Sequence, residues 1–228
     1  MIDQSSFTDS PLNLTTGSSI VLGITGQIAA GKSTLAGILC EFGGVNLEVD
    51  EVGHRMLANP EVIQKLTEAF GSDILDSSGS VSRKILGRRA FASPATNRQL
   101  NDIMHPPMIL EVSRFVQVEA EKKTALIIVN AALLYTMGLD RLCDAIVYVR
   151  APANQRLNRM ITARGMPMEA AKARLFAQDP EPLQGPRVFF CDNQGPFLDL
   201  CQWVSEFFLP QLEGVFPCHL LHQPPRQP

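Results

Sequence analysis

GQIAAGKS, from Gly26 to Ser33, is the stretch of this sequence that decides the fold. It matches the phosphate-binding pattern G-x-x-x-x-G-K-[ST], and it stands between an apolar run, Ile20–Ile24, and a stretch of helical character that begins near Ser33. Backbone N–H groups in such a loop point at phosphate oxygens, and the positive end of the following helix adds to their attraction. The pattern therefore predicts a protein that binds a nucleoside triphosphate.

The loop suggests a role for each of its residues. Lys32 is expected to contact the β- and γ-phosphates, and the Ser33 hydroxyl is expected to bind Mg²⁺. A glycine-rich turn with a surface lysine is the alternative that carries no function. The residues predicted to hold the nucleotide are Gly26, Gln27, Ile28, Ala29, Ala30, Gly31, Lys32, Ser33 and Thr34.

Composition argues against several other classes of protein. The 228 residues, of which 45% are hydrophobic, can bury one sizeable core with a small appended subdomain. A net charge of −3 gives no general attraction for polyanions. We therefore expect neither nucleic acid nor a membrane as a partner, and no obligatory protein partner is evident.

The chain ends and the cysteines predict a cytoplasmic protein. Residues 1–19 have neither a basic start nor an apolar core, so we expect a disordered extension rather than a secretory signal. The longest apolar stretch, 125–135, is interrupted by Asn130 and is too short to span a bilayer. Five cysteines without C-x-x-C spacing favour reduced thiols that fill the core. Residues 211–228 are proline-rich and are expected to form a flexible tail.

Five short apolar runs, most of them separated by stretches long enough for helices, are typical of a doubly wound, parallel α/β sheet of the P-loop NTPase type. We expect one kinase domain over residues 20–210, whose core comprises 20–60 and 116–210. The predicted strands are Ile20–Ile24, Val45–Val49, Ala125–Val129, Ala145–Val149 and Arg187–Cys191.

Two further segments read as additions to this core. Residues 61–115 are helical and more polar, with a turn at Asp76–Ser80 and prolines, Pro94 and Pro106-Pro107, that are expected to mark helix ends; this segment is the predicted acceptor-binding insert. Residues 152–178 follow helical spacing that breaks at Gly165–Pro167. Four arginines cluster there, which predicts a mobile, cationic lid: Arg156, Arg159, Arg164 and Arg174.

Asp50 is the candidate general base. The chain has no D-x-x-G segment at a suitable distance and no N-K-x-D segment, which argues against a GTPase. Asp50 follows the second predicted strand, at the edge where open α/β sheets bind ligands, and transfer of a phosphoryl group to an alcohol needs a carboxylate there. Two alternatives stay open, in which Asp50 is only a helix N-cap or Glu51 is the reactive acid. Glu48 would share a strand face with Asp50.

Three more polar residues are ambiguous from spacing alone. His54 and Arg55 follow Asp50 closely and fit either a phosphate contact or a solvated surface. His105, ahead of Pro106, fits either a ligand contact or the end of a helix.

Taken together, these segments resemble the dephospho-coenzyme A kinase family over about residues 20–195. ITGQIAAGKST is similar to the nucleotide loop of that family, and LEVDEVGHRML is similar to its DAD-x-x-A-[HR] segment, with Asp50 on the second acid. The block from Phe70 to Pro106 is more diagnostic than the loop, because it resembles a pattern that runs from F-G through R-x-x-L to L-x-x-x-x-H-P. Its matching positions are Arg83, Leu86, Phe91, Leu100, His105 and Pro106.

Later segments resemble the family as well. ALLYTMGLDRLCD is similar to P-L-L-F-E-x-x-L-D-x-x-x-D, and Asp192–Gly195 is similar to a D-N-x-G segment associated with the adenine end of ATP, which brings in Asn193. The positions that match the arginine-rich lid of the family are Arg159, Arg164, Arg174 and Gln178.

The resemblance implies transfer of the γ-phosphate of ATP to the ribose 3′-hydroxyl of dephospho-coenzyme A, the last step of coenzyme A synthesis, with Mg²⁺ required. It implies that Asp50 is the base and a second metal ligand beside Ser33, and that Lys32 holds the triphosphate. Arg159 and Arg164 would close over the phosphates. The implied contacts to the acceptor are His54, Arg83 and His105.

The chain departs from the family pattern at several positions. Gln27 replaces the second loop glycine and Ala29 occupies the fourth loop position, so both add side chains beside the phosphates. Asn130 stands where many relatives carry an acid. Ala132, Thr136 and Phe189 differ as well. Two alternatives therefore stay open: a P-loop kinase of another small acceptor, such as a nucleoside monophosphate, and a degenerate nucleotide-binding relative without turnover.

Overall fold

The computed structural model describes residues 19–176 and 187–212. The predicted extension before residue 19, positions 177–178 of the predicted lid and the predicted tail from residue 213 onward lie outside the described residues. The chain divides into two compact units, one made of residues 1–47 and 116–228 and the other of residues 48–115. The predicted insert, 61–115, falls within the second unit, and its function as an acceptor-binding segment stays a prediction.

The first unit is built on a five-stranded sheet with the order β2-β3-β1-β4-β5. The register pairs β1 in parallel with β3 and with β4, and pairs β4 in parallel with β5. The predicted parallel α/β fold is therefore confirmed. The strands are β1 (Ile20–Gly26), β2 (Val45–Glu48), β3 (Leu126–Asn130), β4 (Ala145–Arg150) and β5 (Val188–Asp192).

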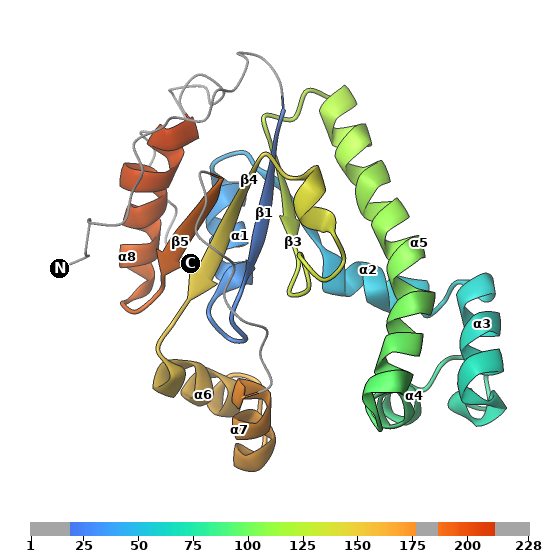
Figure 1. The fold of residues 1–228 in the computed structure, drawn as a ribbon. Helices are drawn as coiled ribbons and strands as arrows, with labels where there is room; N and C mark the ends of the chain where they lie inside the picture. The colour runs from blue at the N-terminus through green and yellow to red at the C-terminus, as the bar shows by residue number, and fades with distance from the viewer. Residues whose placement is uncertain (1–18, 177–186, 213–228) are drawn as a thin grey trace. The chain divides into compact units, whose positions relative to one another are not determined.

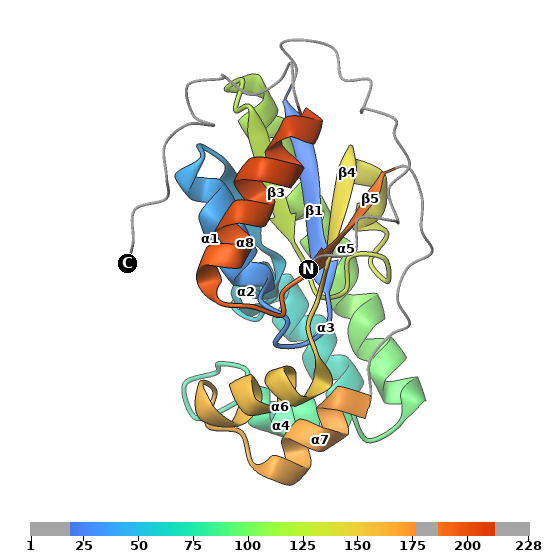
Figure 2. The same ribbon diagram turned by 90° about the vertical axis from the view of Figure 1, so that its left-hand side faces the viewer.

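Both faces of the sheet are buried, which explains why its strands read as unbroken apolar runs. Ile20, Leu22 and Ile24 of β1 belong to a core cluster that covers one face. Helices on the same side of the sheet complete this cluster (Figure 2). They are α1 (Lys32–Glu41), α8 (Phe197–Gln202), the π-helical η3 (Trp203–Phe208) and η4 (Leu209–Leu212).

The opposite face packs against the segment that links β3 to β4, which contains η2 (Leu139–Leu142). A Cβ atom at Gly23 would lie 2.9 Å from both Cys143 Sγ and Leu134 Cδ2, so this packing is close. Burial raises the pKa of the Cys143 and Cys191 thiols to about 12. These two thiols are core-filling groups, as the spacing of the cysteines predicts.

Two further helices, α6 (Ala153–Thr162) and α7 (Met168–Phe176), follow β4 and lie below the sheet in Figure 1. Gly165 separates them with a φ of +61°, a left-handed conformation that glycine adopts without strain. The predicted break in the helical spacing is confirmed.

The second unit is helical. Asn59 caps α3, because its side chain accepts a hydrogen bond of 2.9 Å from the Glu61 N–H and Pro60 occupies the first helical position. A buried cluster that includes Leu66, Phe70 and Leu86 joins the elements of this unit. They are α2 (Val49–Met56), α3 (Pro60–Phe70), η1 (Ser72–Ile74), α4 (Arg83–Ala90) and most of α5 (Pro94–Glu121).

Three local expectations need comment in this unit. The turn at Asp76–Ser80 is confirmed, since Asp76 Oδ1 accepts hydrogen bonds from the Ser78 and Ser80 N–H groups. The helix end expected at Pro106-Pro107 is wrong, because α5 runs through both prolines. Proline removes a helical hydrogen bond, but burial of Met108 and Val112 beyond it holds the helix together.

The strand expected to reach Val49 ends at Glu48, because α2 begins one residue earlier than the pattern predicts. Asp50 is therefore helical, and the expectation that Glu48 and Asp50 share a strand face is wrong. The side-chain alternation behind that expectation holds only within a strand.

We predict opposite effects for alanine at two glycines of the first unit. At Gly26 the φ is +133° and a Cβ atom would lie 2.2 Å from the Val149 carbonyl oxygen, so Gly26→Ala should lower the free energy of unfolding by about 3 kcal/mol. At Gly37, inside α1, nothing lies within 4 Å of the added atom, so Gly37→Ala should raise it by about 0.5–1 kcal/mol. Urea denaturation measures both, and equal effects would contradict this geometry.

Candidate active site

The phosphate loop leaves β1 in a conformation that only a few residues adopt easily. Gly26, Ala29 and Gly31 all have positive φ angles, of 133°, 57° and 107°. Successive N–H groups in such turns form a concave site that binds anions. The backbone thus has the form that the motif predicts.

Ala29 is a departure from the family pattern that the structure explains. An alanine in the left-handed region costs about 1–2 kcal/mol relative to an ordinary conformation. The Ala29 side chain is buried and packs with Met160 and Ala171 of the two following helices. This packing offsets part of the strain, so the methyl group belongs to the contact between the loop and α6–α7.

The first turn of α1 is open to an anion. Gly31 is the N-cap residue, no side chain caps the helix, and no acidic residue occupies its first turn. Uncapped N–H groups at a helix N-terminus attract phosphate. Ser33 and Thr34, in this turn, are exposed.

The Lys32 side chain turns back over the loop. Its Nζ atom donates hydrogen bonds of 2.9 Å to the Gly26 carbonyl oxygen and 3.1 Å to the Gln27 carbonyl oxygen. A phosphate oxygen is a stronger acceptor for an ammonium group than a carbonyl is. The residue therefore lies at the loop with a donor group that can be redirected to a nucleotide.

Arg159 and Asn193 meet on the outer side of the loop. Arg159 Nη1 lies 3.2 Å from the carbonyl oxygens of both Ala29 and Ala30. Asn193 Nδ2 donates to the same Ala30 oxygen at 2.7 Å. The structure thus brings these two predicted site residues to the phosphate loop, from the segments that follow β4 and β5.

The four arginines of the predicted lid differ in their surroundings. Arg156 is buried, with 6% of its surface exposed, and its Nε donates to the Ala151 carbonyl oxygen, so its role is structural. Arg164 and Arg174 are exposed. Of this group, Arg159 is the arginine for which a contact with the loop is described.

Asp50 lies in the second unit, two residues beyond the end of β2. It is exposed in the first turn of α2, next to Glu51, which is exposed as well. The N-cap of α2 is Glu48, so the alternative in which Asp50 serves as the cap is wrong.

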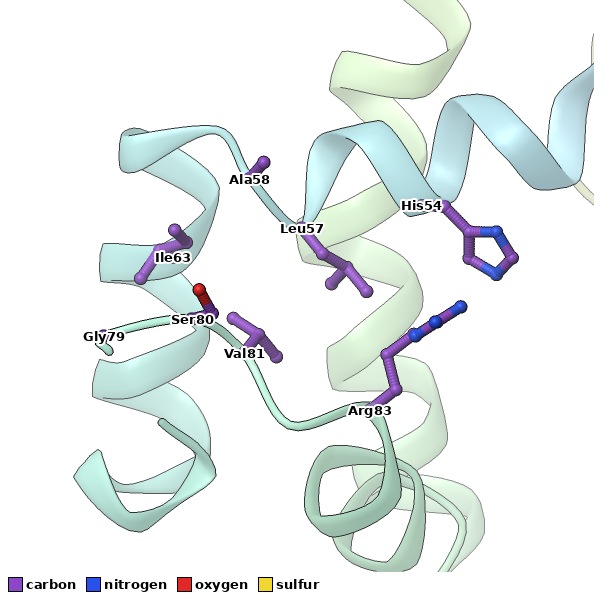
Figure 3. Close-up of a pocket in the computed structure, with 8 residues that line it drawn as sticks. All are labelled: His54, Leu57, Ala58, Ile63, Gly79, Ser80, Val81 and Arg83. Atoms are coloured by element: carbon purple, nitrogen blue, oxygen red, sulfur yellow. The ribbon is translucent and has the colours of Figure 1, made fainter. Parts of the chain in front are cut away.

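A pocket of about 450 Å³ lies within the second unit and joins two of the predicted acceptor contacts, His54 and Arg83 (Figure 3). Both side chains point into the same space from different helices, and both are exposed. The other lining residues are Leu57, Ala58, Ile63, Gly79, Ser80 and Val81. The pocket therefore combines two cationic or hydrogen-bonding side chains with an apolar wall.

His105 is not among the residues that line this pocket. It lies on α5, where burial lowers the pKa of its imidazole and Asp102 partly opposes that shift. A lowered pKa keeps the ring neutral at pH 7. His105 thus offers a hydrogen bond rather than a positive charge to any ligand.

The comparison with known proteins decides the family. A sequence model described as dephospho-CoA kinase matches residues 20–184. This chain belongs to the dephospho-CoA kinase family. The match confirms the predicted enzyme class, a kinase for which ATP is the phosphate donor, and it gives no support to another acceptor.

Individual members of the dephospho-CoA kinase family agree with this assignment. The dephospho-CoA kinase of Corynebacterium diphtheriae is 32% identical over 77% of this chain and 88% of its own. That of Anaeromyxobacter dehalogenans is 34% identical over 77% of this chain and 84% of its own.

Solved structures support the fold. The Thermus thermophilus protein TT1252 has a TM-score of 0.70 at 28% identity, covering 86% of this chain and 98% of its own. The dephospho-CoA kinase of Campylobacter jejuni, at 23% identity and a TM-score of 0.59, covers 83% of this chain and 95% of its own.

Two contacts at the site of this dephospho-CoA kinase family member are absent from the sequence-based predictions. Gln27 Oε1 accepts a hydrogen bond of 3.2 Å from the Ala151 N–H, which ties the loop to the start of the segment carrying α6. Arg150 and Asp192 form two hydrogen bonds of 2.7 Å between the ends of β4 and β5. Neither has a local sequence signal, because each joins residues more than forty positions apart.

We predict that Arg159→Ala lowers kinase turnover by about 100-fold while changing thermal stability little, because loss of one preorganised cationic donor costs that much in other enzymes. Arg164→Ala should also lower turnover more than stability. Arg141→Ala, at an exposed residue of η2, is the control and should leave both unchanged. Steady-state assays and thermal melts measure these effects, and a melt that falls with turnover unaltered would show a purely structural arginine.

Proposed function

We propose that this chain transfers the γ-phosphoryl group of ATP to the ribose 3′-hydroxyl of dephospho-coenzyme A, giving coenzyme A and ADP. The observation that carries the proposal is the phosphate loop, with three left-handed residues and an uncapped α1, in a member of the dephospho-CoA kinase family. Among the described residues, no helix is both long and apolar enough to cross a bilayer. The cytoplasmic location stays a prediction.

The phosphates of ATP are assigned to the loop and its cations. Lys32 and the N–H groups of the loop would bind the β- and γ-phosphates, and Arg159 would exchange its carbonyl acceptors for phosphate oxygens. Arg164, exposed beyond the end of α6, would close over the same group. Asn193 is the residue assigned to the adenine end. Its bond to Ala30 supports a position beside the nucleotide.

Mg²⁺ is the proposed metal, and Ser33 and Asp50 are its proposed protein ligands. The Ser33 hydroxyl is exposed at the start of α1, and oxygen donors suit this ion. Among the described residues there is no group of three or more His, Cys, Asp or Glu that could hold a metal, which fits an ion held largely by phosphate oxygens and water. When bound, the metal would neutralise charge on the phosphates.

Asp50 is the proposed general base. Its exposed carboxylate follows the end of β2, and such a group can accept the hydroxyl proton of the acceptor as the oxygen attacks phosphorus. Solvent exposure suits this role, because the acceptor must approach it.

The pocket of the second unit is the proposed binding site for the nucleotide end of the acceptor. Arg83 and His54 would contact phosphate oxygens of dephospho-coenzyme A, and Leu57, Ile63 and Val81 would contact its apolar groups. His105, neutral at pH 7, would contribute a hydrogen bond outside this pocket.

Asp50→Asn should abolish acceptor-dependent ADP release, with a loss of at least about 100-fold, while ATP binding stays intact. Glu51→Gln is the matched control, because Glu51 is the adjacent exposed acid, and it should retain turnover. A coupled ADP assay with calorimetric ATP binding makes the comparison. Loss of turnover in Glu51→Gln alone would move the role of the base to Glu51.

Arg83→Ala should raise the KM for dephospho-coenzyme A about tenfold and leave the KM for ATP unchanged, because a charge-assisted hydrogen bond contributes about 1.5–3 kcal/mol. Arg88→Ala, at an exposed residue of the same helix that does not line the pocket, should leave both constants near wild type. A rise in the KM for ATP in Arg83→Ala would contradict the assignment of the pocket to the acceptor.

A further inference from the structure

Asn130 occupies a position with direct access to the metal ligand of the phosphate loop. It is the last residue of β3 and lies opposite Ile24 of β1 in the parallel register. Its side chain is buried, with 3% of its surface exposed. Its Nδ2 atom lies 3.5 Å from Ser33 Oγ, the long limit of a hydrogen bond. A buried amide thus reaches the one loop hydroxyl that is assigned to Mg²⁺.

The chemistry of this position differs from that of most phosphate-loop proteins. In that class an acid near the loop holds Mg²⁺ together with the loop serine or threonine. Here the residue that contacts the serine is a neutral amide. An amide can donate a hydrogen bond to the Ser33 hydroxyl through Nδ2 and offer Oδ1 as an acceptor to a metal-bound water. It adds no negative charge for the cation.

The donor set fits Mg²⁺ only with a nucleotide present. Ser33 Oγ and Asn130 Oδ1 are neutral oxygens, and neutral oxygens alone compete poorly with the hydration shell of Mg²⁺. The attraction must come from charges on the nucleotide and from Asp50, whose role is itself proposed. The metal would therefore enter this site together with the nucleotide.

We propose that Asn130 positions the Ser33 hydroxyl for Mg²⁺ and that its neutral amide makes metal binding conditional on a bound nucleotide. This inference rests on the proposed function only in its use of a metal–nucleotide complex. Asn130 acts through Ser33, so it is a positioning residue rather than a catalytic one.

The test uses Mn²⁺ as a paramagnetic probe, counted by electron paramagnetic resonance, with the full chain in the presence and absence of ADP. Wild-type protein should bind Mn²⁺ with ADP and show no binding without it. Asn130→Asp should bind Mn²⁺ about tenfold more tightly with ADP, and measurably without it, because the new carboxylate attracts the cation. Gln202→Glu, which adds the same charge at an exposed residue of α8, should behave as wild type.

Asn130→Ala keeps the test informative if the buried carboxylate of the first variant lowers stability. This variant should weaken Mn²⁺ binding about threefold with ADP present and leave the affinity for ADP in a chelator unchanged. A merely structural role would lower the ADP affinity equally with and without metal, and that result would overturn the inference.

Two other results separate this inference from the proposed function. If Asn130→Asp and wild type bound Mn²⁺ equally, with and without ADP, the inference would be wrong even for an active kinase. If the protein bound Mn²⁺ and ADP as described but released no ADP with dephospho-coenzyme A, the inference would stand and the proposed function would be wrong.

Discussion

The close passage of the phosphate loop against strand β4 is the constraint on which the site depends. The Gln27 N–H donates to the Val149 carbonyl oxygen at 3.1 Å, and the Gly26 backbone lies too near Val149 for any side chain. Two residues after Val149, the Ala151 N–H donates to the Gln27 side chain. The loop and the segment that carries α6 are therefore anchored at the same strand end, so movement of one is expected to affect the other.

This arrangement accounts for two departures from the family pattern. A side chain at position 27 does not enter the anion site, because the Gln27 carboxamide bonds to the backbone of the next segment. The methyl group of Ala29 packs with α6 and α7 at the cost of a left-handed alanine. Phe189, a third departure, is half-buried and lies edge-on to Phe208 at 5.4 Å, where it fills the core between β5 and η3.

Local charge, rather than overall charge, prepares the site for a nucleotide. The chain carries a net charge of −3, yet Lys32 and Arg159 both direct their donors at the carbonyl oxygens of the loop. Carbonyl oxygens carry partial charge, and phosphate oxygens carry more, so a nucleotide can replace them at both cations. Asn130 keeps negative charge away from the same region.

The sequence predicts the fold well because both of its signals are local. Unbroken apolar runs indicate buried parallel strands, and the loop motif fixes which strand precedes the phosphate site. Helix α5 defeats such reasoning, since the packing of Met108 and Val112 outweighs the local effect of Pro106 and Pro107. The start of α2 at Val49 is missed because an apolar residue fits a strand end or a first helical turn equally well.

The candidate site is predictable only in part. The residues of the motif follow from spacing, but the meeting of Arg159, Asn193 and Ala30 depends on how distant strand ends come together. The burial of Arg156 is also invisible in a sequence where four arginines recur with similar spacing. The most direct measurement is mass spectrometry of the product formed from ATP and dephospho-coenzyme A. The account predicts one coenzyme A, with the new phosphate on the ribose 3′-hydroxyl, for each ADP. Phosphorylation of a nucleoside monophosphate instead, or ADP release that needs no acceptor, would contradict it.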